Sequence, residues 1–444
     1  MVNKQENPLL IPNIFNTRKL FLKQKGILLN EEVSNISWNY TTHDNHLRCR
    51  EDNSNKYNVF YQDDFYFQDF NDALNIMIKC SELFYSNEYK IIGIENMDGG
   101  GYPDLYEFWH QLIQLKTLDK TYRAVLNIPF INEYMTKNEL YSDFANAETC
   151  RYIESMEELG QYKDNYGYSD VFGSYITHNR TGIYDFLDKT KRKFLDKFRK
   201  NILENNKKFL KSSTDILIYT DGFSFSATSG FFKAFQNTGG AIIVGFNGNP
   251  KIEGTSEFDA SQSSSSVEAF QCDEYFNLQN NGFIVSGITY SESYDDSWRN
   301  KSQTPIPREY TVDLVDERVP IYGPYSDDIY DKFIKEAEKI FKNYEIKCSK
   351  NDPRLLLEDE SCQLNEHEHG GHPCGENGEW DKDKCEAYYC DPGYYYDTYN
   401  KKCILDICTN GNETKIYLDE SYIETQEFNI KPGEEINFYI NDTN

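Results

Sequence analysis

A serine-rich stretch lies between an apolar run and a helix-like segment in the middle of the chain. TDGFSFSATSGFF spans residues 220–232 and follows the apolar residues ILIY. A hydroxyl at a helix start feels the positive end of the helix dipole, and neighbouring amides can bind an oxyanion, so Ser226 is a candidate nucleophile. Serine is also a favoured N-cap, so a purely structural role is the alternative. Ser224 and Ser229 compete for either role.

Three glycines, Gly99, Gly100 and Gly101, follow a second apolar run in IIGIENMDGGGY. Glycine lets backbone N–H groups approach a ligand closely, and such amides can form an oxyanion hole. An ordinary glycine turn is the alternative.

Lys251 lies 25 residues after Ser226, beyond the apolar stretch AIIVGF. A lysine that is partly desolvated has a lowered pKa and can act as the general base for a serine. A solvated loop lysine is the alternative reading of this position.

The elements that would position these residues follow from the pattern of apolar residues. We expect strands at 57–61, 89–95, 214–221 and 239–248, and helices at 67–84, 104–116, 182–212, 226–238 and 325–348. Strand, helix and strand at the spacing of residues 214–248 form a βαβ unit with parallel strands. The fold class is therefore α/β.

The segment GFSFSATSGFFKAFQ, followed by AIIVGFNGNPK, resembles the tail-specific (C-terminal processing) serine proteases. IIGIENMDGGG resembles the earlier glycine turn of that family, and the resemblance covers roughly residues 57 to 345. It implies a ClpP/crotonase-like fold, with Ser226 as nucleophile and Lys251 as base. It also implies an oxyanion hole made by Gly100 or Gly101 with the Ala227 amide, and no cofactor or metal.

The sequence departs from the family pattern at several positions. Glu95 stands where the family often has arginine, Ser229 replaces the usual glutamate, and Pro250 replaces the glycine before the lysine. The eukaryotic branch of the family is similar to the chlamydial protease-like activity factor, which uses serine with histidine and glutamate. His43 and His46 are the two histidines that precede the glycine run, and we retain His46 and Glu309 as alternative base and acid.

The composition limits the class of partner. The 444 residues carry a formal charge of −27, which disfavours nucleic acid and anionic membranes as partners. Aromatic residues make up 15% of the chain, enough for large cores. No run of about 20 apolar residues occurs, so we expect no membrane-spanning helix.

Cysteine is concentrated towards the end of the chain. Five of the 11 cysteines lie in the first 348 residues, and the other six are Cys362, Cys374, Cys385, Cys390, Cys403 and Cys408. This density predicts a disulfide-rich module, and CDPGYYYDTYNKKC resembles an EGF-like turn. The connectivity stays open. HEHGGHPC has the composition of a metal site without its spacing, and we interpret it as a solvated loop.

The expected domains are an N-terminal extension at 1–55, a catalytic domain at 56–348, a cysteine-rich module at 349–410 and a further β-rich segment at 411–444. The cysteine cluster and six N-x-S/T sequons favour a secreted or cell-surface glycoprotein. No signal peptide is recognisable, and we interpret both ends as incomplete.

These observations favour a serine-type peptidase that cleaves protein or peptide substrates. The alternative is an inactive secreted binding or adhesion protein that reuses the fold, with the cysteine-rich tail as its contact with a protein partner.

Overall fold

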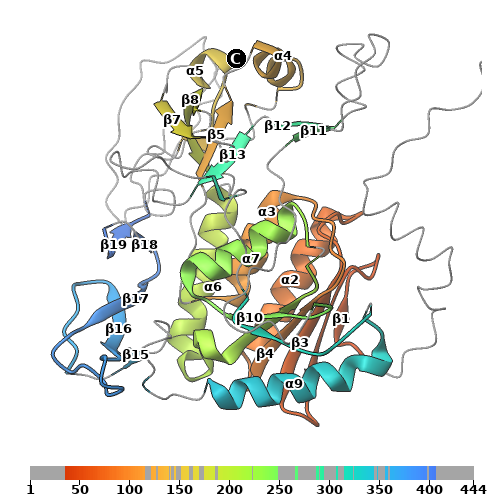
Figure 1. Cartoon of the computed structure of the whole chain (residues 1–444), viewed down its shortest axis with the longest axis vertical. Coiled ribbons are helices and arrows are strands. Elements are labelled where there is room, and N and C mark those ends of the chain that lie inside the picture. Colours follow the sequence, from red (N-terminus) through yellow and green to blue (C-terminus); the bar gives the residue numbers. More distant parts are fainter. Residues whose placement is uncertain are drawn as a thin grey trace, which may run out of the picture.

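A seven-stranded sheet forms the centre of the computed structural model of the chain (Figure 1). The structure describes residues 36–115, 122–126, 129–139, 141, 145–146, 152–159, 164–169, 175–185, 189–222, 224–248, 266–268, 287–289, 291–294, 307–308, 315–323, 325–344, 348, 356–358, 361–397 and 400–406. Within these residues, no helix has the length and apolar character that crossing a membrane requires.

The strands of the central sheet lie in the order β1-β2-β3-β4-β9-β10-β14. They are β1 (Tyr40–Thr41), β2 (Leu47–Asp52), β3 (Tyr57–Gln62), β4 (Lys90–Glu95), β9 (Ile216–Thr220), β10 (Ile242–Gly245) and β14 (Glu317–Arg318). The strands from β3 to β14 are parallel, whereas β1 and β2 are antiparallel to their neighbours. The expected α/β class with a βαβ unit is therefore what the structure shows.

Helices cover both faces of this sheet. One face carries α2 (Phe70–Phe84), α3 (Pro103–Ile113), α6 (Lys189–Asn205) and α7 (Ala227–Thr238), and the other carries α9 (Tyr330–Asn343) (Figure 1). From β3 to β10 each new parallel strand is added on the same side. Right-handed crossovers then place successive helices on a single face.

The two cores are separated by the alternation of side chains along each strand. In β9, Ile216 and Ile218 face the helices of the α7 side, whereas Leu217 and Tyr219 face α9. All four are fully buried, which explains why this strand is apolar throughout.

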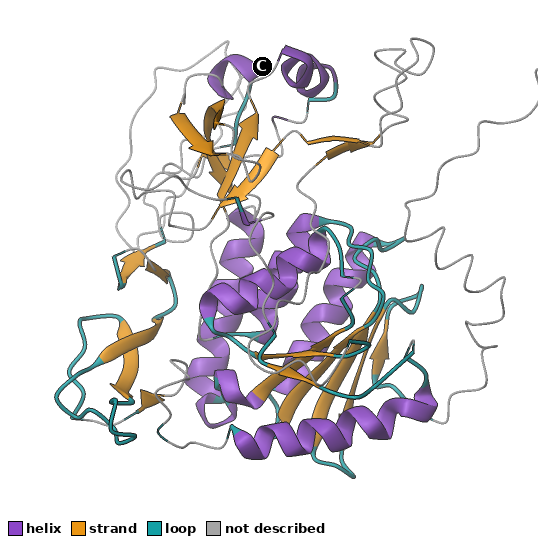
Figure 2. Ribbon diagram, in the orientation of Figure 1, coloured by secondary structure: helices purple, strands orange, loops and turns teal. Residues whose placement is uncertain are grey.

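A second, smaller sheet lies apart from the first (Figure 2). Its strands are β13 (Ser291–Tyr294), β5 (Tyr122–Leu126), β8 (Tyr175–Asp185) and β6 (Ala145–Asn146), and β7 (Asp164–Ser169) also pairs with β8. Two helices, α4 (Pro129–Lys137) and α5 (Met156–Leu159), belong to the same part of the chain, and β11 (Ser266–Glu268) pairs with β12 (Gly287–Thr289).

The tail consists of small antiparallel sheets. One sheet contains β15 (Leu356–Leu357), β16 (Glu368–Pro373) and β17 (Glu386–Cys390). The other contains β18 (Tyr394–Asp397) and β19 (Lys402–Leu405). Disulfides join Cys348 to Cys374, Cys362 to Cys385 and Cys390 to Cys403. Cys408, the sixth predicted tail cysteine, lies outside the described residues.

Three sequence expectations differ from the structure. The expected extension at 1–55 includes β1 and β2, which pair into the central sheet and are tied to α2 by the disulfide Cys49–Cys80. The sequence predicts a helix at 182–212, but residues 182–185 form the end of β8 and α6 starts only at Lys189. The tail also begins before residue 349, since Cys348 is bonded within it.

Candidate active site

Ser226 stands at the junction between the segment after β9 and the first turn of α7. Its backbone has φ 54° and ψ −115°, a conformation that a residue with a Cβ rarely adopts. Its side chain makes no capping hydrogen bond to the helix. An N-cap role therefore does not account for this serine. Backbone strain of this kind costs about 1–3 kcal/mol and is typical of functional sites, as in nucleophile elbows.

The residues after β4 lie directly against Ser226. We call residues 98–101 the glycine turn and residues 224–226 the serine turn. A Cβ placed on Gly100 would lie 2.6 Å from the Ser226 Cβ and from the Phe225 carbonyl oxygen, and 2.9 Å from the Ala227 nitrogen. Gly100 has φ +91°, so both its conformation and this contact require glycine. The structure thus brings Gly100, Ser226 and Ala227 together.

The loop after β3 covers the other side of the glycine turn. The Phe65 N–H donates to the Gly100 carbonyl (2.9 Å), and the Tyr102 N–H donates to the Phe65 carbonyl (3.2 Å). A Cβ on Gly101 would lie 2.2 Å from the Phe65 carbonyl carbon, and its φ is +147°. Gly101 is therefore held between the loop and α3.

The predicted oxyanion donors differ in what they bind. The Gly100 N–H donates to Asp98 Oδ1 at 2.8 Å, so it points at a carboxylate rather than towards the serine. The N–H groups of Gly101 and Ala227 make no hydrogen bond to another residue within the described part of the chain. Ala227 opens α7, where an unpaired N–H at the positive helix end suits an anion.

Ser224, the alternative nucleophile, is fully buried two residues before Ser226. Its hydroxyl is 2.8 Å from the Thr220 hydroxyl at the end of β9. Such a pair satisfies both buried hydroxyls and fixes the start of the serine turn.

His46 lies in the turn before β2 and forms a pair with Asp63. Its Nδ1 is 2.7 Å from Asp63 Oδ1, and the Asp63 N–H donates to the His46 carbonyl at 3.1 Å. Burial lowers the pKa of His46, but the hydrogen bond and charge of Asp63, with Asp64 and Asp44 nearby, outweigh it and raise the pKa. With Nδ1 bonded to a carboxylate, Nε2 is the nitrogen available to take up a proton.

Three buried carboxyl groups surround the base of the glycine turn. Burial, and then the charge of Asp98, raise the pKa of Glu95 well above its ordinary value. Burial and the charge of Asp64 raise the pKa of Asp98, and interactions with Thr228, Gly100 and Glu95 partly offset this rise. The resulting pKa is about 7. Asp221 Oδ2 accepts the Met97 N–H at 2.8 Å.

Sequence reasoning named Glu95 only as a departure from the family pattern, and it missed Asp98 and Asp221. The signal was present, since Asp98 directly precedes the glycines and Asp221 directly follows β9. Side chains at the carboxyl ends of adjacent parallel strands meet at one edge of the sheet. Lys251 and Glu309 lie outside the described residues, so their roles stay predictions.

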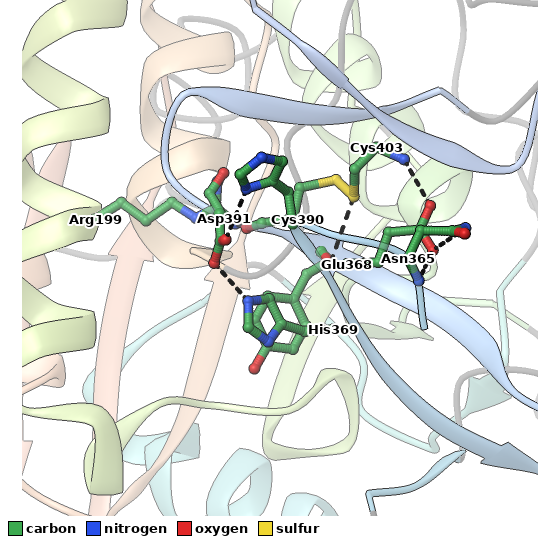
Figure 3. The surroundings of a disulfide bond; sticks show 9 residues. Arg199, Asn365, Glu368, His369, Cys390, Asp391 and Cys403 are labelled. Carbon is green, nitrogen blue, oxygen red and sulfur yellow. Dashed lines mark hydrogen bonds and ion pairs between the residues drawn. A yellow bond between two sulfur atoms is a disulfide. The ribbon is translucent and has the colours of Figure 1, made fainter. Parts of the chain in front are cut away.

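The tail histidines lie in β16 or at its entrance and bind other residues, so this segment is not the solvated loop that the sequence suggested. His367 and His369 each contact one oxygen of Asp391, at 3.2 and 2.6 Å (Figure 3). His372 is buried, with Nε2 3.0 Å from the Ser361 hydroxyl and Nδ1 2.8 Å from the Lys384 carbonyl.

One group of possible metal ligands occurs among the described residues: Cys362, His372 and Cys385. The two cysteines are joined as a disulfide, and the nitrogens of His372 already have the partners given above. A thiolate is the form of cysteine that binds metal, so this group does not fit a metal ion in the oxidised protein.

The tail is attached to the helices that carry the site. The Arg199 guanidinium of α6 donates to the Cys390 carbonyl and, at 3.5 Å, to the Asp391 carbonyl (Figure 3). The Tyr388 hydroxyl donates to the Gly239 carbonyl at the end of α7 (3.4 Å). Gln114, which ends α3, donates to the Tyr388 hydroxyl at 3.4 Å.

No protein family and no curated protein matches the chain in sequence. Similar solved structures include mature CPAF complexed with lactacystin (TM-score 0.31, 12% identity, 67% of this chain and 54% of that one). A lipoprotein from Streptococcus agalactiae is also similar, with a TM-score of 0.32, 11% identity, and coverage of 67% of this chain and 70% of that one. So is a peptidase candidate from Parabacteroides merdae, with a TM-score of 0.31, 11% identity, and coverage of 72% of this chain and 69% of that one. The match spans about half of the CPAF chain. At such TM-scores, the chemistry of this chain must be argued from its own residues.

Proposed function

We propose that this protein is a serine-type peptidase with a ClpP/crotonase-like domain, which acts on protein or peptide substrates in an oxidising, extracellular setting. Ser226 attacks the peptide carbonyl, and the amides of Ala227 and Gly101 hold the oxyanion. The observation that carries the proposal is the backbone of Ser226: a strained serine at a helix start whose hydroxyl does not cap that helix.

The surroundings of Ser226 support this chemistry. The hydroxyl stands beside the positive end of the twelve-residue helix α7, which favours a developing negative charge. Two N–H groups near it have no hydrogen-bond partner among the described residues, as an oxyanion hole requires before substrate binds. The order of the parallel strands, with successive helices on one face, supports the fold assignment.

The general base is Lys251 or His46. His46 has the partner that a catalytic histidine needs, because Asp63 binds Nδ1 and leaves Nε2 to accept the serine proton. The loop that carries Asp63 continues to Phe65, which is bonded to Gly100 beside the serine. A lysine base requires instead a desolvated amine.

The test is labelling of the purified protein by a fluorophosphonate, with hydrolysis of an unfolded protein measured in parallel. We expect the wild type to be labelled at Ser226 and to cleave the substrate, and Ser226→Ala to do neither. Ser224→Ala is the matched control: it removes a buried hydroxyl two residues away, so it leaves Thr220 unpaired and lowers stability, but the folded variant should still be labelled at Ser226.

Two further variants distinguish the bases. If His46 is the base, His46→Gln abolishes cleavage while Lys251→Ala retains it, and the Lys251 assignment predicts the reverse pattern. A folded wild type that is neither labelled nor active would refute the peptidase function. It would favour a binding protein that meets its partner through the cysteine-rich tail.

A further inference from the structure

Glu95 is a buried acid in acidic surroundings. It ends β4, its side chain is fully buried, and no N–H or O–H group of the described residues donates to either carboxyl oxygen. The charged groups that act on it are Asp98, Asp63 and Asp221, all of which are carboxylates. An ionised carboxylate cannot be held there without a partner, so Glu95 keeps its proton in the folded protein.

Asp98 is the acceptor for that proton. Its carboxyl group is fully buried, its Oδ2 has no hydrogen-bond donor among the described residues, and Glu95 and Asp98 act on each other's pKa. Two interacting carboxyl groups that are both fully buried share one proton, because two negative charges repel strongly in a medium of low polarity. Asp64 is the other charged group acting on Asp98, and it also favours protonation of the pair.

Asp98 also connects the two turns of the site. Its backbone carbonyl accepts the Phe225 N–H at 3.1 Å, which places the residue before Ser226. Its Oδ1 accepts the Gly100 N–H at 2.8 Å, and the Thr228 hydroxyl of α7 lies beside the same carboxyl group. One residue thus fixes the glycine turn against the serine turn.

We propose that Asp98 is a positioning residue for Ser226, and that Glu95 holds the single proton that allows Asp98 to accept the Gly100 N–H. This role rests on the proposed peptidase function. While Asp98 holds the Gly100 amide, the oxyanion donors are Gly101 and Ala227. The glycine that the sequence suggested as a donor then shapes the hole instead of binding the substrate.

Amide variants separate this role from general packing. Glu95→Gln supplies a permanent N–H donor in place of the shared proton. Asp98→Asn keeps an oxygen for Gly100 and offers an N–H to Glu95. Asp98→Ala removes the acceptor. Glu338→Gln, on the exposed side of α9, is the control for loss of one carboxylate.

The first measurement is hydrogen exchange of the peptide that contains residues 97–101. We expect exchange at the Gly100 amide to rise by about 10- to 100-fold in Asp98→Ala, because a hydrogen bond to a charged group is lost. Exchange in Asp98→Asn and Glu95→Gln should stay within a few-fold of wild type. Equal exchange in Asp98→Ala and wild type would overturn the positioning role, whether or not the protein is a peptidase.

The second measurement is the pH dependence of the urea midpoint. The folded wild type holds a proton on Glu95 that the unfolded chain releases, so stability falls as pH rises above the unfolded value near 4.5. We expect Glu95→Gln to reduce this fall between pH 5 and 8, and Glu338→Gln to leave it unchanged. An unchanged fall in Glu95→Gln would overturn the shared proton.

The third measurement is the rate of Ser226 labelling. Asp98→Ala should slow it at least tenfold, whereas Asp98→Asn should restore most of the rate and alter its pH profile. An Asp98→Asn variant as slow as Asp98→Ala would contradict positioning by hydrogen bonding. A wild type that is never labelled would refute the peptidase function, while hydrogen exchange and the pH dependence still decide the state of the pair.

Discussion

Replacing Gly100 by alanine tests the contact between the glycine turn and the serine turn. The new methyl group would lie 2.6 Å from both the Ser226 Cβ and the Phe225 oxygen, and 2.9 Å from the Ala227 nitrogen. Two of these neighbours are backbone atoms, which cannot move aside as a flexible side chain can. The methyl group must therefore displace the segment that carries Ser226.

Gly323 provides a matched control. It has φ +90°, almost the same as Gly100, and its N–H also donates to a side-chain oxygen, Asn247 Oδ1 at 2.6 Å. A Cβ at Gly323 would meet nothing within 4 Å. The cost of positive φ, about 1–2 kcal/mol for a residue with a Cβ, is therefore common to both substitutions.

The difference between the two variants isolates the steric cost. Forcing a methyl group into a closely packed site costs about 1–3 kcal/mol. We expect Gly323→Ala to lower the free energy of unfolding by about 1–2 kcal/mol and Gly100→Ala by about 2–5 kcal/mol. Urea unfolding followed by circular dichroism measures both, and Ser226 labelling should fall only in Gly100→Ala. Equal destabilisation of the two variants would refute the contact.

Three further predictions concern stability. Replacing Cys49 and Cys80 together by alanine opens a loop of 31 residues and should lower the free energy of unfolding by about 3–4 kcal/mol, measured by urea unfolding. A reductant should weaken the wild type more than the variant, which keeps the three tail disulfides. Arg199→Ala should cost about 1.5–3 kcal/mol and expose the tail to limited proteolysis, because it removes charged hydrogen bonds to the tail backbone, whereas the exposed neighbour Lys200→Ala should do neither. His46 has a raised pKa in the folded state, so its contribution is fully present below pH 6.5 and is lost as pH rises through the folded value. Between pH 6 and 8, the melting temperature of the wild type should therefore fall more than that of His46→Gln. An equal fall in the two proteins would contradict the His46–Asp63 pair. His43→Gln, which replaces an exposed histidine, is the control and should behave as the wild type does.

The parts of the site that sequence analysis predicted are those encoded within short segments. The apolar run before Ser226 and the helix after it define strand, turn and helix without reference to the rest of the chain. The glycines after β4 predict a turn from local sequence alone in the same way. The glycine turn and the serine turn meet because β4 and β9 are adjacent parallel strands and each turn follows the carboxyl end of one of them.

The remainder depends on contacts that no local pattern encodes. Glu95 and Asp98 look like ordinary surface acids in the sequence, and only burial by the surrounding chain makes them share a proton. Residues 182–185 open a long amphipathic stretch that suits a helix, but pairing with β5 makes these four residues a strand. Tertiary pairing overrides local preference in such segments.

The attachment of the tail to Arg199 has a consequence for biosynthesis. Its partner, the Cys390 carbonyl, follows 191 residues later in the chain. At a synthesis rate of roughly 5–20 residues per second, about 10–40 seconds pass before the guanidinium of α6 can find it. Through this interval the nascent domain holds an arginine whose final partner does not yet exist. The contact between α6 and the tail therefore forms only after residue 390 has been synthesised, and Cys390 must also be oxidised to its disulfide with Cys403.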